Sequence, residues 1–423
     1  MTGDGKPSTQ TRGMHVAQIN STTFDAALKE YYSDEAVKDL SYEDNPFYAM
    51  VPKLTSLTGD LYVQPVQYGT SVGGRSMTFA DALAGKDTNK YVKFQIDTVE
   101  DYAMISIGRK VMKQSANDRG AFFEARTREI DGMIKSLVRS LSTKLYRNSG
   151  GAIGQVNSSG GASATITLLE PEDICNFEVG MVLEASADDM ADSGDALLVG
   201  SATVTGIDRD AGTLTTAGGN WSTQITGLTA STFLFAKGDA SNSVSGLLAW
   251  IPETAPGGSD SFHGVNRSVD VSRLAGARVS ASGDPVAEAL RKGASRLGRE
   301  GAFPNAVFMS HQKFRDLILE LGNKVEYATT SVTANVGFTG VKIVGSKTPI
   351  TVYADHNCPD KYAMMLAMDS WKLVSIGPTP DLQDDDGLRM LREGSSDGFE
   401  VRASYYANLV CSDPRANCVI TLE

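Results

Sequence analysis

An α+β fold is predicted by three observations on this chain of 423 residues. The first is a long amphipathic helix pattern over residues 115–148, and the second is an alternation of strand and helix patterns from Val265 onward. The third is a change of composition over residues 154–241, which are rich in Gly, Ser, Thr, Asp and Ala. Short strands separated by turns in this segment predict a small all-β domain, a barrel or sandwich, inserted into the fold.

The predicted long helix carries a single apolar stripe. Its apolar residues recur at steps of three and four, the period of one buried helix face: Ile130, Ile134, Leu137, Leu141 and Leu145. Ser115 and Asp118 resemble a capping box at its start, with Asp in place of Glu. At 1.5 Å per residue, about 30 residues span about 45 Å, so the helix either acts as a strut or needs a partner along its whole side.

The N-terminal 54 residues are predicted to form an arm. A polar start is followed by a short amphipathic helix pattern over residues 21–40. Asn45-Pro46 then forces a turn, and Phe47 and Tyr48 begin an apolar plug. Such a plug predicts docking onto another surface, either in the same chain or in a neighbour.

Residues 55–107 predict one long β-hairpin. Its arms are residues 61–68 and 92–107, and Pro65 places the first arm on an edge because proline cannot donate a ladder hydrogen bond. A polar, glycine-bearing tip over residues 69–90 joins the arms. Because a two-stranded ribbon is marginally stable alone, we expect it to lie against another surface, and its tip to contact a neighbouring subunit.

The C-terminal half predicts a mixed α+β unit over residues 242–394. A core-like stretch at 245–251 leads into it, and residues 379–398 read as an exposed loop. The predicted helices are 285–299 and 311–321, and the predicted strands are 306–309, 341–344, 351–354, 362–368 and 372–376. Residues 399–410 and 418–422 are expected to pair as a closing hairpin.

This order of elements resembles the major capsid protein of tailed phages with the Hong Kong 97-type fold. The resemblance rests on the arm, the Asn-Pro-Phe plug, the long hairpin, the long helix, Gly246-Leu247-Leu248 and the α+β unit. It implies an N-terminal arm (1–54), an extended E-loop (55–107), a spine helix in the peripheral domain (108–153), a mainly axial domain (242–394) and closing strands of the peripheral domain (395–423). Residues 154–241 resemble the β-barrel insertion domain that some capsid proteins carry.

The resemblance also implies partners and location. The chain would assemble with itself as hexamers and pentamers into an icosahedral head, with scaffolding and portal proteins and, in some phages, a decoration protein. Double-stranded DNA would be enclosed without sequence-specific binding, and assembly in the host cytoplasm would give a virion. The candidate assembly contacts are Phe47, Tyr48, Arg75, Lys86, Lys90, Asp188, Asp189, Asp192 and Asp195.

Composition argues against several other functions. The formal net charge is −12, with 39 Lys and Arg against 51 Asp and Glu, so nucleic-acid binding is not expected as the primary activity. No apolar run approaches the 18 residues of a membrane span, and the first residues lack the apolar core of a signal peptide. The four cysteines form no CxxC pair and are expected to be reduced.

No catalytic or cofactor motif is expected to act in this chain. The nucleophile elbow, the Walker loop and the dinucleotide fingerprint are absent, and the four histidines are too dispersed for a zinc motif. His356-x-Cys358 has no second ligand pair, and Asp208-x-Asp210-x-Gly212 is more typical of a hairpin turn than of a calcium loop. Asp384-Asp385-Asp386 reads as a solvated loop, with a cation bridge between subunits as the alternative.

Two rival functions stay open from the sequence. An encapsulin-like compartment would share the fold, but the ninety-residue insertion and the lack of a cargo-groove signature disfavour it. A secreted or surface β-rich enzyme could use residues 154–241 as a carbohydrate-binding module. The missing signal peptide and the missing pair of catalytic carboxylates disfavour this second rival.

Overall fold

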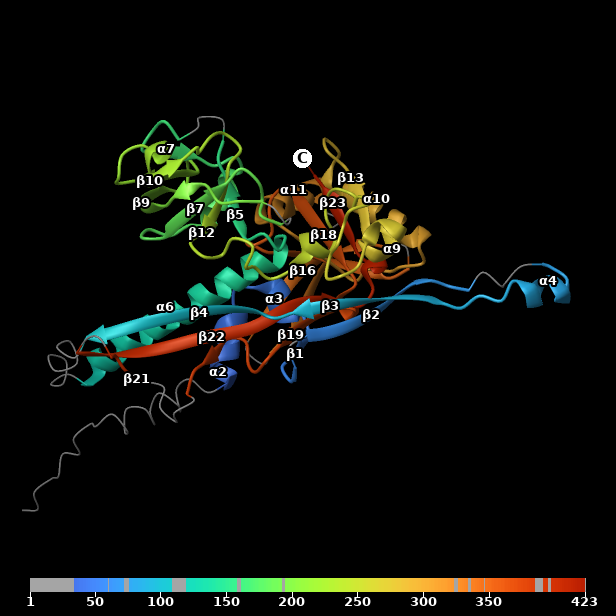
Figure 1. Cartoon of the computed structure of the whole chain (residues 1–423), viewed down its shortest axis with the longest axis horizontal. Helices are drawn as coiled ribbons and strands as arrows, with labels where there is room; N and C mark the ends of the chain where they lie inside the picture. The colour runs from blue at the N-terminus through green and yellow to red at the C-terminus, as the bar shows by residue number, and fades with distance from the viewer. Residues whose placement is uncertain are drawn as a thin grey trace, which may run out of the picture.

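The computed structural model describes residues 34–59, 61–71, 76–108, 119–157, 161–191, 195–322, 326–333, 336–345, 347–384, 391–394 and 397–422. Four parts are visible in Figure 1: a peripheral sheet along one long helix, an axial sheet with covering helices, an inserted barrel, and a ribbon that projects far to one side. Within the described residues, no helix combines the length and apolar character needed to cross a membrane.

The long helix is α6, Arg119–Tyr146. Its apolar stripe packs against strands β4, Val99–Gly108, and β22, Gly398–Cys411. The five stripe residues, Ile130, Ile134, Leu137, Leu141 and Leu145, are each at most 3% exposed. The proposed capping box at Ser115 and Asp118 lies outside the described residues.

The peripheral sheet is centred on β22. Its order is β1 (Lys53–Leu54), β19 (Trp371–Ser375), β22 and β20 (Asp381–Leu382), and both β4 and β21 (Leu391–Arg392) also pair with β22. The prediction that the hairpin arm continues to residue 107 is therefore wrong. After residue 97 the chain leaves the ribbon and β4 joins β22, where Val99, Ala103 and Ile105 pack half-buried against the core that includes α6.

The axial sheet has seven strands. Their order is β13 (Ala277–Ser280), β23 (Cys418–Thr421), β18 (Tyr362–Leu366), β14 (Ala306–Met309), β17 (Pro349–Ala354), β16 (Gly337–Val344) and β15 (Glu326–Ser331). Helices α10, Val286–Arg299, and α11, His311–Leu321, pack on it.

The last strand corrects a second prediction. Strand β23 does not form a closing hairpin with β22, since it lies between β13 and β18 of the axial sheet. Its Cys-Val-Ile run is buried without alternation, as expected for a central strand covered on both faces. In the same way β19 belongs to the peripheral sheet, although residues 242–394 were assigned mainly to the axial domain.

The insertion is a closed β-barrel. The strand order is β5 (Ala152–Gln155), β12 (Phe233–Ala236), β7 (Val182–Ser186), β9 (Ala202–Asp208), β10 (Thr213–Thr216) and β6 (Thr165–Thr167). A bridge between Val156 and Leu168 joins the two ends of this order. The barrel has a hydrophobic core of its own, separate from the two cores of the remaining fold.

The described part of the arm contains two short helices, α2 (Asp34–Tyr42) and α3 (Pro46–Met50). The prediction of a helix over residues 21–40 is confirmed from Asp34 onward, and residues 21–33 lie outside the described residues. The projecting ribbon consists of β2 (Leu61–Gly69) and β3 (Lys90–Asp97). Helix α4 (Phe79–Ala84) forms part of its tip, where only a polar loop was expected.

Candidate assembly site

A buried cation fixes the C-terminal end of α6. Lys144 Nζ donates to Asp101 Oδ2 at 2.8 Å and to Asp239 Oδ1 at 3.2 Å, and its side chain is only 4% exposed. Tyr405 donates its hydroxyl to the same Asp101 oxygen at 2.9 Å. Burial lowers the pKa of Lys144, but the two carboxylates outweigh burial, so the pKa is raised and the amine is charged. One side chain thus ties the spine to the peripheral sheet and to the barrel.

Sequence reasoning missed this cluster, although one signal was present. Lys144 lies three residues after Leu141 and directly before Leu145, so it shares the apolar side of α6. A lysine on an apolar face needs buried carboxylate partners, because an unpaired buried charge is costly. Asp101 and Asp239 come from segments far apart in the chain, which the sequence does not bring together.

A second buried cluster joins the arm, the spine and the axial sheet. Asp355, 1% exposed, accepts hydrogen bonds from Phe47 N at 3.2 Å, Tyr146 Oη at 2.8 Å and Asn357 N at 2.9 Å. The Asn357 amide donates to Asn45 Oδ1 at 3.0 Å. Burial, with Asp355 close by, raises the pKa of Tyr146 and keeps its hydroxyl a donor.

The apolar plug is seated inside its own subunit. Phe47 and Tyr48 are 0% and 1% exposed. The Phe47 ring centroid lies 5.3 Å from that of Tyr146 and 5.2 Å from that of Phe308, and Tyr48 donates its hydroxyl to the Thr379 carbonyl. Of the two alternatives left open by the sequence, docking in the same chain or on a neighbour, the first holds here, and the role of Phe47 and Tyr48 as candidate assembly contacts is corrected. Proline at the start of α3 turns both rings into the gap between spine and axial sheet, where no side-chain surface is left for another subunit.

The acidic segment of the barrel is partly engaged within the chain. Asp189 accepts a hydrogen bond at 2.7 Å from the amide of Asn148, at the end of the spine, so it is not the free projecting group that was expected. Asp188 is exposed and Asp195 is half-buried, whereas Asp192 lies outside the described residues. The contact role of these residues stays a prediction.

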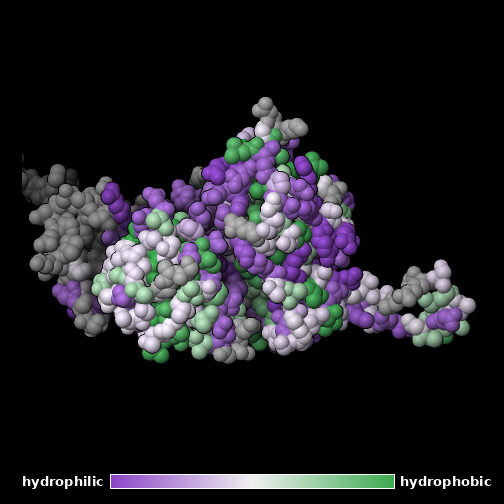
Figure 2. All heavy atoms as spheres, turned by 90° about the horizontal axis from the view of Figure 1, so that it is seen from above, coloured by the Kyte–Doolittle hydropathy of each residue, from purple (hydrophilic) through white to green (hydrophobic). Residues whose placement is uncertain are grey.

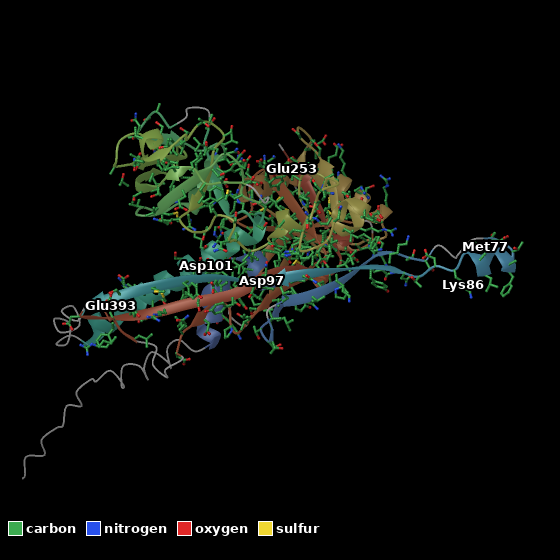
Figure 3. All side chains as sticks on the ribbon, in the orientation of Figure 1. Met77, Lys86, Asp97, Asp101, Glu253 and Glu393 are labelled. Atoms are coloured by element: carbon green, nitrogen blue, oxygen red, sulfur yellow. The ribbon has the colours of Figure 1, made fainter. Side chains whose placement is uncertain are left out.

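The paired strands β2 and β3 of the ribbon are held by the body of the protein along their length, as far as Tyr68 beside the last pair, Gly69 with Lys90. Arg273 donates to the Tyr68 carbonyl at 2.8 Å, and Gln95 N donates to the His263 carbonyl at 3.0 Å. Phe94 is fully buried near the root. Beyond the last pair the ribbon extends away from the body, as Figure 3 shows with Met77 and Lys86 at its far end.

The tip of the ribbon is an exposed apolar helix. Thr78 caps α4 by accepting from Asp81 N at 3.2 Å, and no residue of α4 is buried. Three of its large apolar side chains are open to solvent: Phe79 at 84%, Leu83 at 52% and Met77 at 39%. At the right-hand end of Figure 2 the tip shows pale green spheres beside purple ones. Exposed apolar patches of this kind are candidates for contact surfaces.

Of the three basic residues predicted to make contacts at the tip, the structure describes Lys86 and Lys90. Lys86 and Lys90 are exposed, and Lys90 pairs in register with Gly69 at the end of the ribbon. Arg75 lies outside the described residues. The assembly role of all three stays a prediction.

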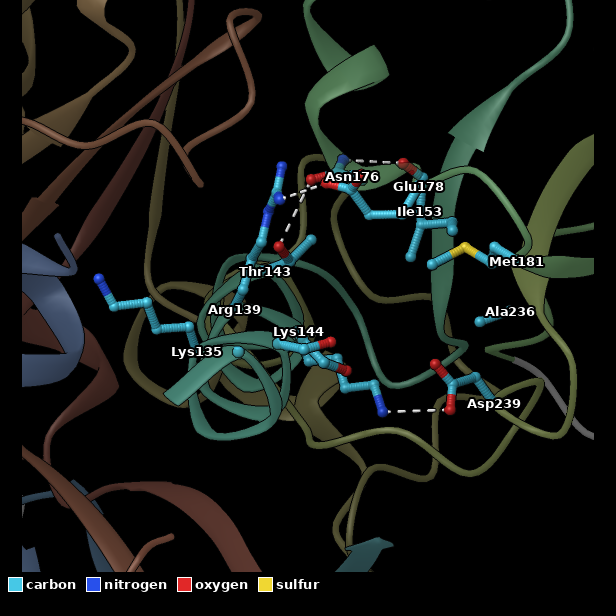
Figure 4. A pocket seen from close by; sticks show the side chains of 13 residues that line it. Lys135, Arg139, Thr143, Lys144, Ile153, Asn176, Glu178, Met181, Ala236 and Asp239 are labelled. Carbon is cyan, nitrogen blue, oxygen red and sulfur yellow. Dashed lines mark hydrogen bonds and ion pairs between the residues drawn. The ribbon is translucent and has the colours of Figure 1, made fainter. Parts of the chain in front are cut away.

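A groove of about 380 Å³ separates α6 from the barrel. Lys135, Arg139 and Thr143 of the spine line one side, and Glu178 and Met181 of the barrel line the other (Figure 4). Ile153 and Ala236 add aliphatic surface on the barrel side. The remaining lining residues on the spine side include the small residues Gly132, Ser136 and Ser140. Arg139 bridges the two walls through its ion pair with Glu178, at 2.7 Å, and Lys144 also links them through Asp239.

The Asp208 motif lies in a hairpin turn and Cys358 is buried. Among the described residues, no group of three or more His, Cys, Asp or Glu could hold a metal ion. Asp208 accepts from the backbone N of Asp210 and of Ala211, which forms the hairpin turn between β9 and β10. Burial raises the pKa of Cys418 to about 12 and also raises that of Cys358, so neither thiol is a ready nucleophile.

Comparison with known proteins identifies the fold class. No protein-family model matches the chain, and no curated protein matches it either. Among solved structures, the capsid of Cyanophage A-1(L) matches with a TM-score of 0.51 at 12% identity, over 89% of this chain and 92% of that chain. The predicted fold is therefore confirmed: the chain has the α+β capsid fold of the Hong Kong 97 type.

Two further similar structures are also protein shells. The holo-SrpI encapsulin complex from Synechococcus elongatus PCC 7942 matches with a TM-score of 0.43 at 11% identity, over 89% of this chain and 87% of that chain. The capsid of the native GTA particle matches with a TM-score of 0.42 at 12% identity, over 99% of this chain and 95% of that chain.

Proposed function

We propose that this chain is the major capsid protein of a tailed phage with double-stranded DNA. It assembles with itself, as hexamers and pentamers, into the icosahedral head of the virion. Scaffolding and portal proteins guide its assembly in the host cytoplasm. It acts through repeated interfaces and not through catalysis.

The observation that carries this proposal is a projecting ribbon whose apolar tip is not covered by the described part of its own subunit. A two-stranded ribbon projects from the body and ends in an apolar helix with no buried residue. The paired strands of the ribbon pack on the body of their own chain, whereas α4 at the tip has no buried residue. Exposed apolar patches of this kind mark interaction sites. A ribbon fixed at its root and unsupported at its tip suits a contact from one copy to the next. Such head-to-tail contacts generate rings, from which a closed shell can be built.

The negative charge of the chain supports the container role. A protein that grips DNA does so by placing Lys and Arg on phosphates. With a formal net charge of −12, the subunit favours enclosure of DNA over tight binding to it. The DNA would thus stay mobile enough to be packaged and released.

Electron microscopy of the purified recombinant chain tests the proposal. We expect closed shells, capsomers or tubular assemblies, alone or after coexpression with the scaffolding protein of the same phage. A chain that stays monomeric at high concentration under both conditions would contradict it.

A further inference from the structure

We propose that the outward face of α10 contacts the phosphate backbone of the packaged double-stranded DNA. Six charged or polar side chains line a hollow on this face, the basic hollow: Glu288, Arg291, Lys292, Ser295, Arg296 and Arg299. The inference rests on the proposed function and adds to it the place where the subunit meets the enclosed DNA. It puts the α10 side of the axial sheet on the inner face of the shell.

Helix α10 presents the basic hollow in a fixed orientation. Its other face is buried against the axial sheet and α11, with Leu290 and Leu297 among the buried residues. A Cβ added at Gly293 would lie 2.6 Å from Cδ1 of Ile420, so the helix packs closely on β23. The outward face carries four cations between residues 291 and 299, with no acidic residue among them.

Two of the four cations are paired within the subunit. Lys292 Nζ lies 2.7 Å from a carboxylate oxygen of Asp284 and 3.2 Å from one of Glu288. Arg296 pairs with Glu300 at 3.1 Å. These ion pairs largely balance the two charges, so the positive charge of the hollow comes from the other two cations.

Arg291 and Arg299 are these two cations. Both residues are exposed, and neither guanidinium has an ion pair or a hydrogen bond with any residue that the structure describes. A cation in the last helical turn, such as Arg299, interacts favourably with the helix dipole, but Arg291 lies in the middle of α10. At 1.5 Å per residue the two are about 12 Å apart along the helix axis. They can therefore reach two separate phosphates of one duplex, since neighbouring phosphates of a strand are about 3.4 Å apart along its axis.

The lining of the hollow favours phosphate over a protein partner. Interfaces between proteins have an apolar, fully buried centre, and among the described residues no apolar side chain lines this hollow. Contacts with the DNA backbone are polar, and a guanidinium matches the oxygens of a phosphate with two parallel hydrogen bonds. With a volume of about 370 Å³, the hollow is shallow and open, which suits a long backbone better than a small enclosed ligand.

The rest of the subunit keeps this contact weak. The formal net charge of −12 repels DNA away from the hollow. Each neutralised phosphate adds about −0.9 to the slope of log affinity against log salt, so two contacts give a slope of about −2. A weak contact repeated in every subunit would align the outermost DNA with the shell and still let it move.

Fluorescence anisotropy on unassembled subunits tests the contact, with a labelled duplex of about 20 base pairs and salt from about 20 to 200 mM. We expect weak binding by the parent, with a slope of about −2. The variant R291Q/R299Q should bind at least about tenfold more weakly at the lowest salt and lose most of the slope. The variant R291K/R299K keeps both charges and should keep the slope.

The matched control is R315Q/K342Q, which removes two cations of the axial domain outside the hollow and changes the net charge equally. Every variant should melt within about 2 °C of the parent, because no buried side chain is changed. Equal losses of affinity for R315Q/K342Q and R291Q/R299Q would mean that only net charge matters. That result would overturn the inference, as would a parent without affinity for the duplex.

A poly-glutamate peptide with as many charges as the duplex distinguishes DNA from an acidic protein partner. It should displace the labelled duplex less well than unlabelled duplex does, because a flexible peptide loses more conformational entropy on binding. A peptide that competes better than DNA would make the hollow a docking site for an acidic protein and would overturn the inference.

The position of the hollow in the shell is tested with Ser295→Cys in a background of Cys175→Ser, because the other three cysteines are buried. The introduced thiol should react with a small maleimide in free subunits, but not with a maleimide on a large protein added to closed shells. Labelling of closed shells by the large reagent would overturn this inference while the proposed function stands. A parent chain that forms no particles would overturn both.

Discussion

At the scale of single residues, Lys53 is a half-buried lysine that has, among the described residues, no carboxylate partner of the kind that Lys144 has. Lys53 Nζ lies 4.3 Å from the ring centroids of both Tyr42 and Tyr48 and donates to the Tyr48 carbonyl at 2.6 Å. Burial, with a smaller effect from Lys38, lowers its pKa from 10.5 to about 7. The aromatic rings and the carbonyl only partly replace the water that the amine loses on folding.

This lysine makes stability depend on pH. Between pH 7 and about 10.5 the unfolded chain holds the Lys53 proton more tightly than the folded chain. The free energy of unfolding should therefore rise with pH across this window, by up to about 1.4 kcal/mol for each unit of pKa difference. In Lys53→Met this part of the rise should vanish, as measured by urea unfolding at several pH values. The control Lys135→Met changes an exposed amine and should keep the slope of the parent, and a Lys53→Met slope equal to the parent's would refute the assignment.

Lys144 differs from Lys53 because its charged amine is paired with two carboxylates, and the pairing stabilises the folded chain. Lys144→Met would leave Asp101 and Asp239 without their cation in a mostly buried setting. Breaking a buried pair from one side costs about 3–5 kcal/mol. The expected result is a large fall in the free energy of unfolding, measured by denaturant titration.

The matched control is Lys135→Met, one helix face away. Lys135 makes only an exposed ion pair with Glu43 at 3.8 Å, and such pairs contribute about 0–1 kcal/mol. Equal losses for the two variants would mean that the Lys144 cluster is not a fastening point of the spine.

At the scale of elements, the end of the spine and the start of α8, Leu247–Trp250, require a glycine between them. A Cβ at Gly246 would lie 2.3 Å from the carbonyl oxygen of Lys144 and 2.4 Å from that of Arg147. Gly246→Ala should therefore lower stability by about 1–3 kcal/mol or more through overpacking. Thermal melts would show this, whereas Gly257→Ala, with nothing within 4 Å, should melt like the parent; equal melts for both would refute the close contact.

The inserted barrel is the part of the chain that we expect to fold independently. Its sheet closes on itself and its core is its own. A fragment of residues 150–241 should give a dispersed amide NMR spectrum and a cooperative melt. The expected boundary at 154 is too late, because it cuts β5 and removes the buried Ile153, so the fragment 154–241 should be less stable. A collapsed spectrum for 150–241 would show that the barrel needs the rest of the chain.

At the scale of the whole molecule, the ribbon tip should matter for assembly and not for folding. Residues 70–89 can be replaced by a two-residue Asn-Gly turn, since Gly69 and Lys90 are already paired. Because no residue of α4 is buried, the melting temperature of the subunit should stay within about 2 °C of the parent. Electron microscopy should show no closed particles. Normal particles from this variant would mean that the tip is dispensable. The control is Leu319→Ser, which changes an exposed apolar residue on α11 and should still assemble.

The local sequence pattern was sufficient to predict secondary structure wherever a segment's own residues determine its conformation. The period of Ile130 to Leu145 determined the spine, and the helix pattern over 311–321 matches α11, His311–Leu321. The Asp208 to Gly212 turn between β9 and β10 is also present as predicted. In each case side-chain spacing or turn chemistry within a few residues selects one conformation.

Tertiary structure alone decided which segments meet. The alternation of β4 fits a ribbon and the peripheral sheet equally well, and the choice of β22 follows from packing against the core that includes α6. Lys144 meets Asp101 and Asp239, and Phe47 is seated beside Asp355 and not on a neighbour, because the folded chain brings these distant segments into one buried space. Sequence determines each element through local preference, whereas the pairing of elements depends on burial energy summed over the whole fold.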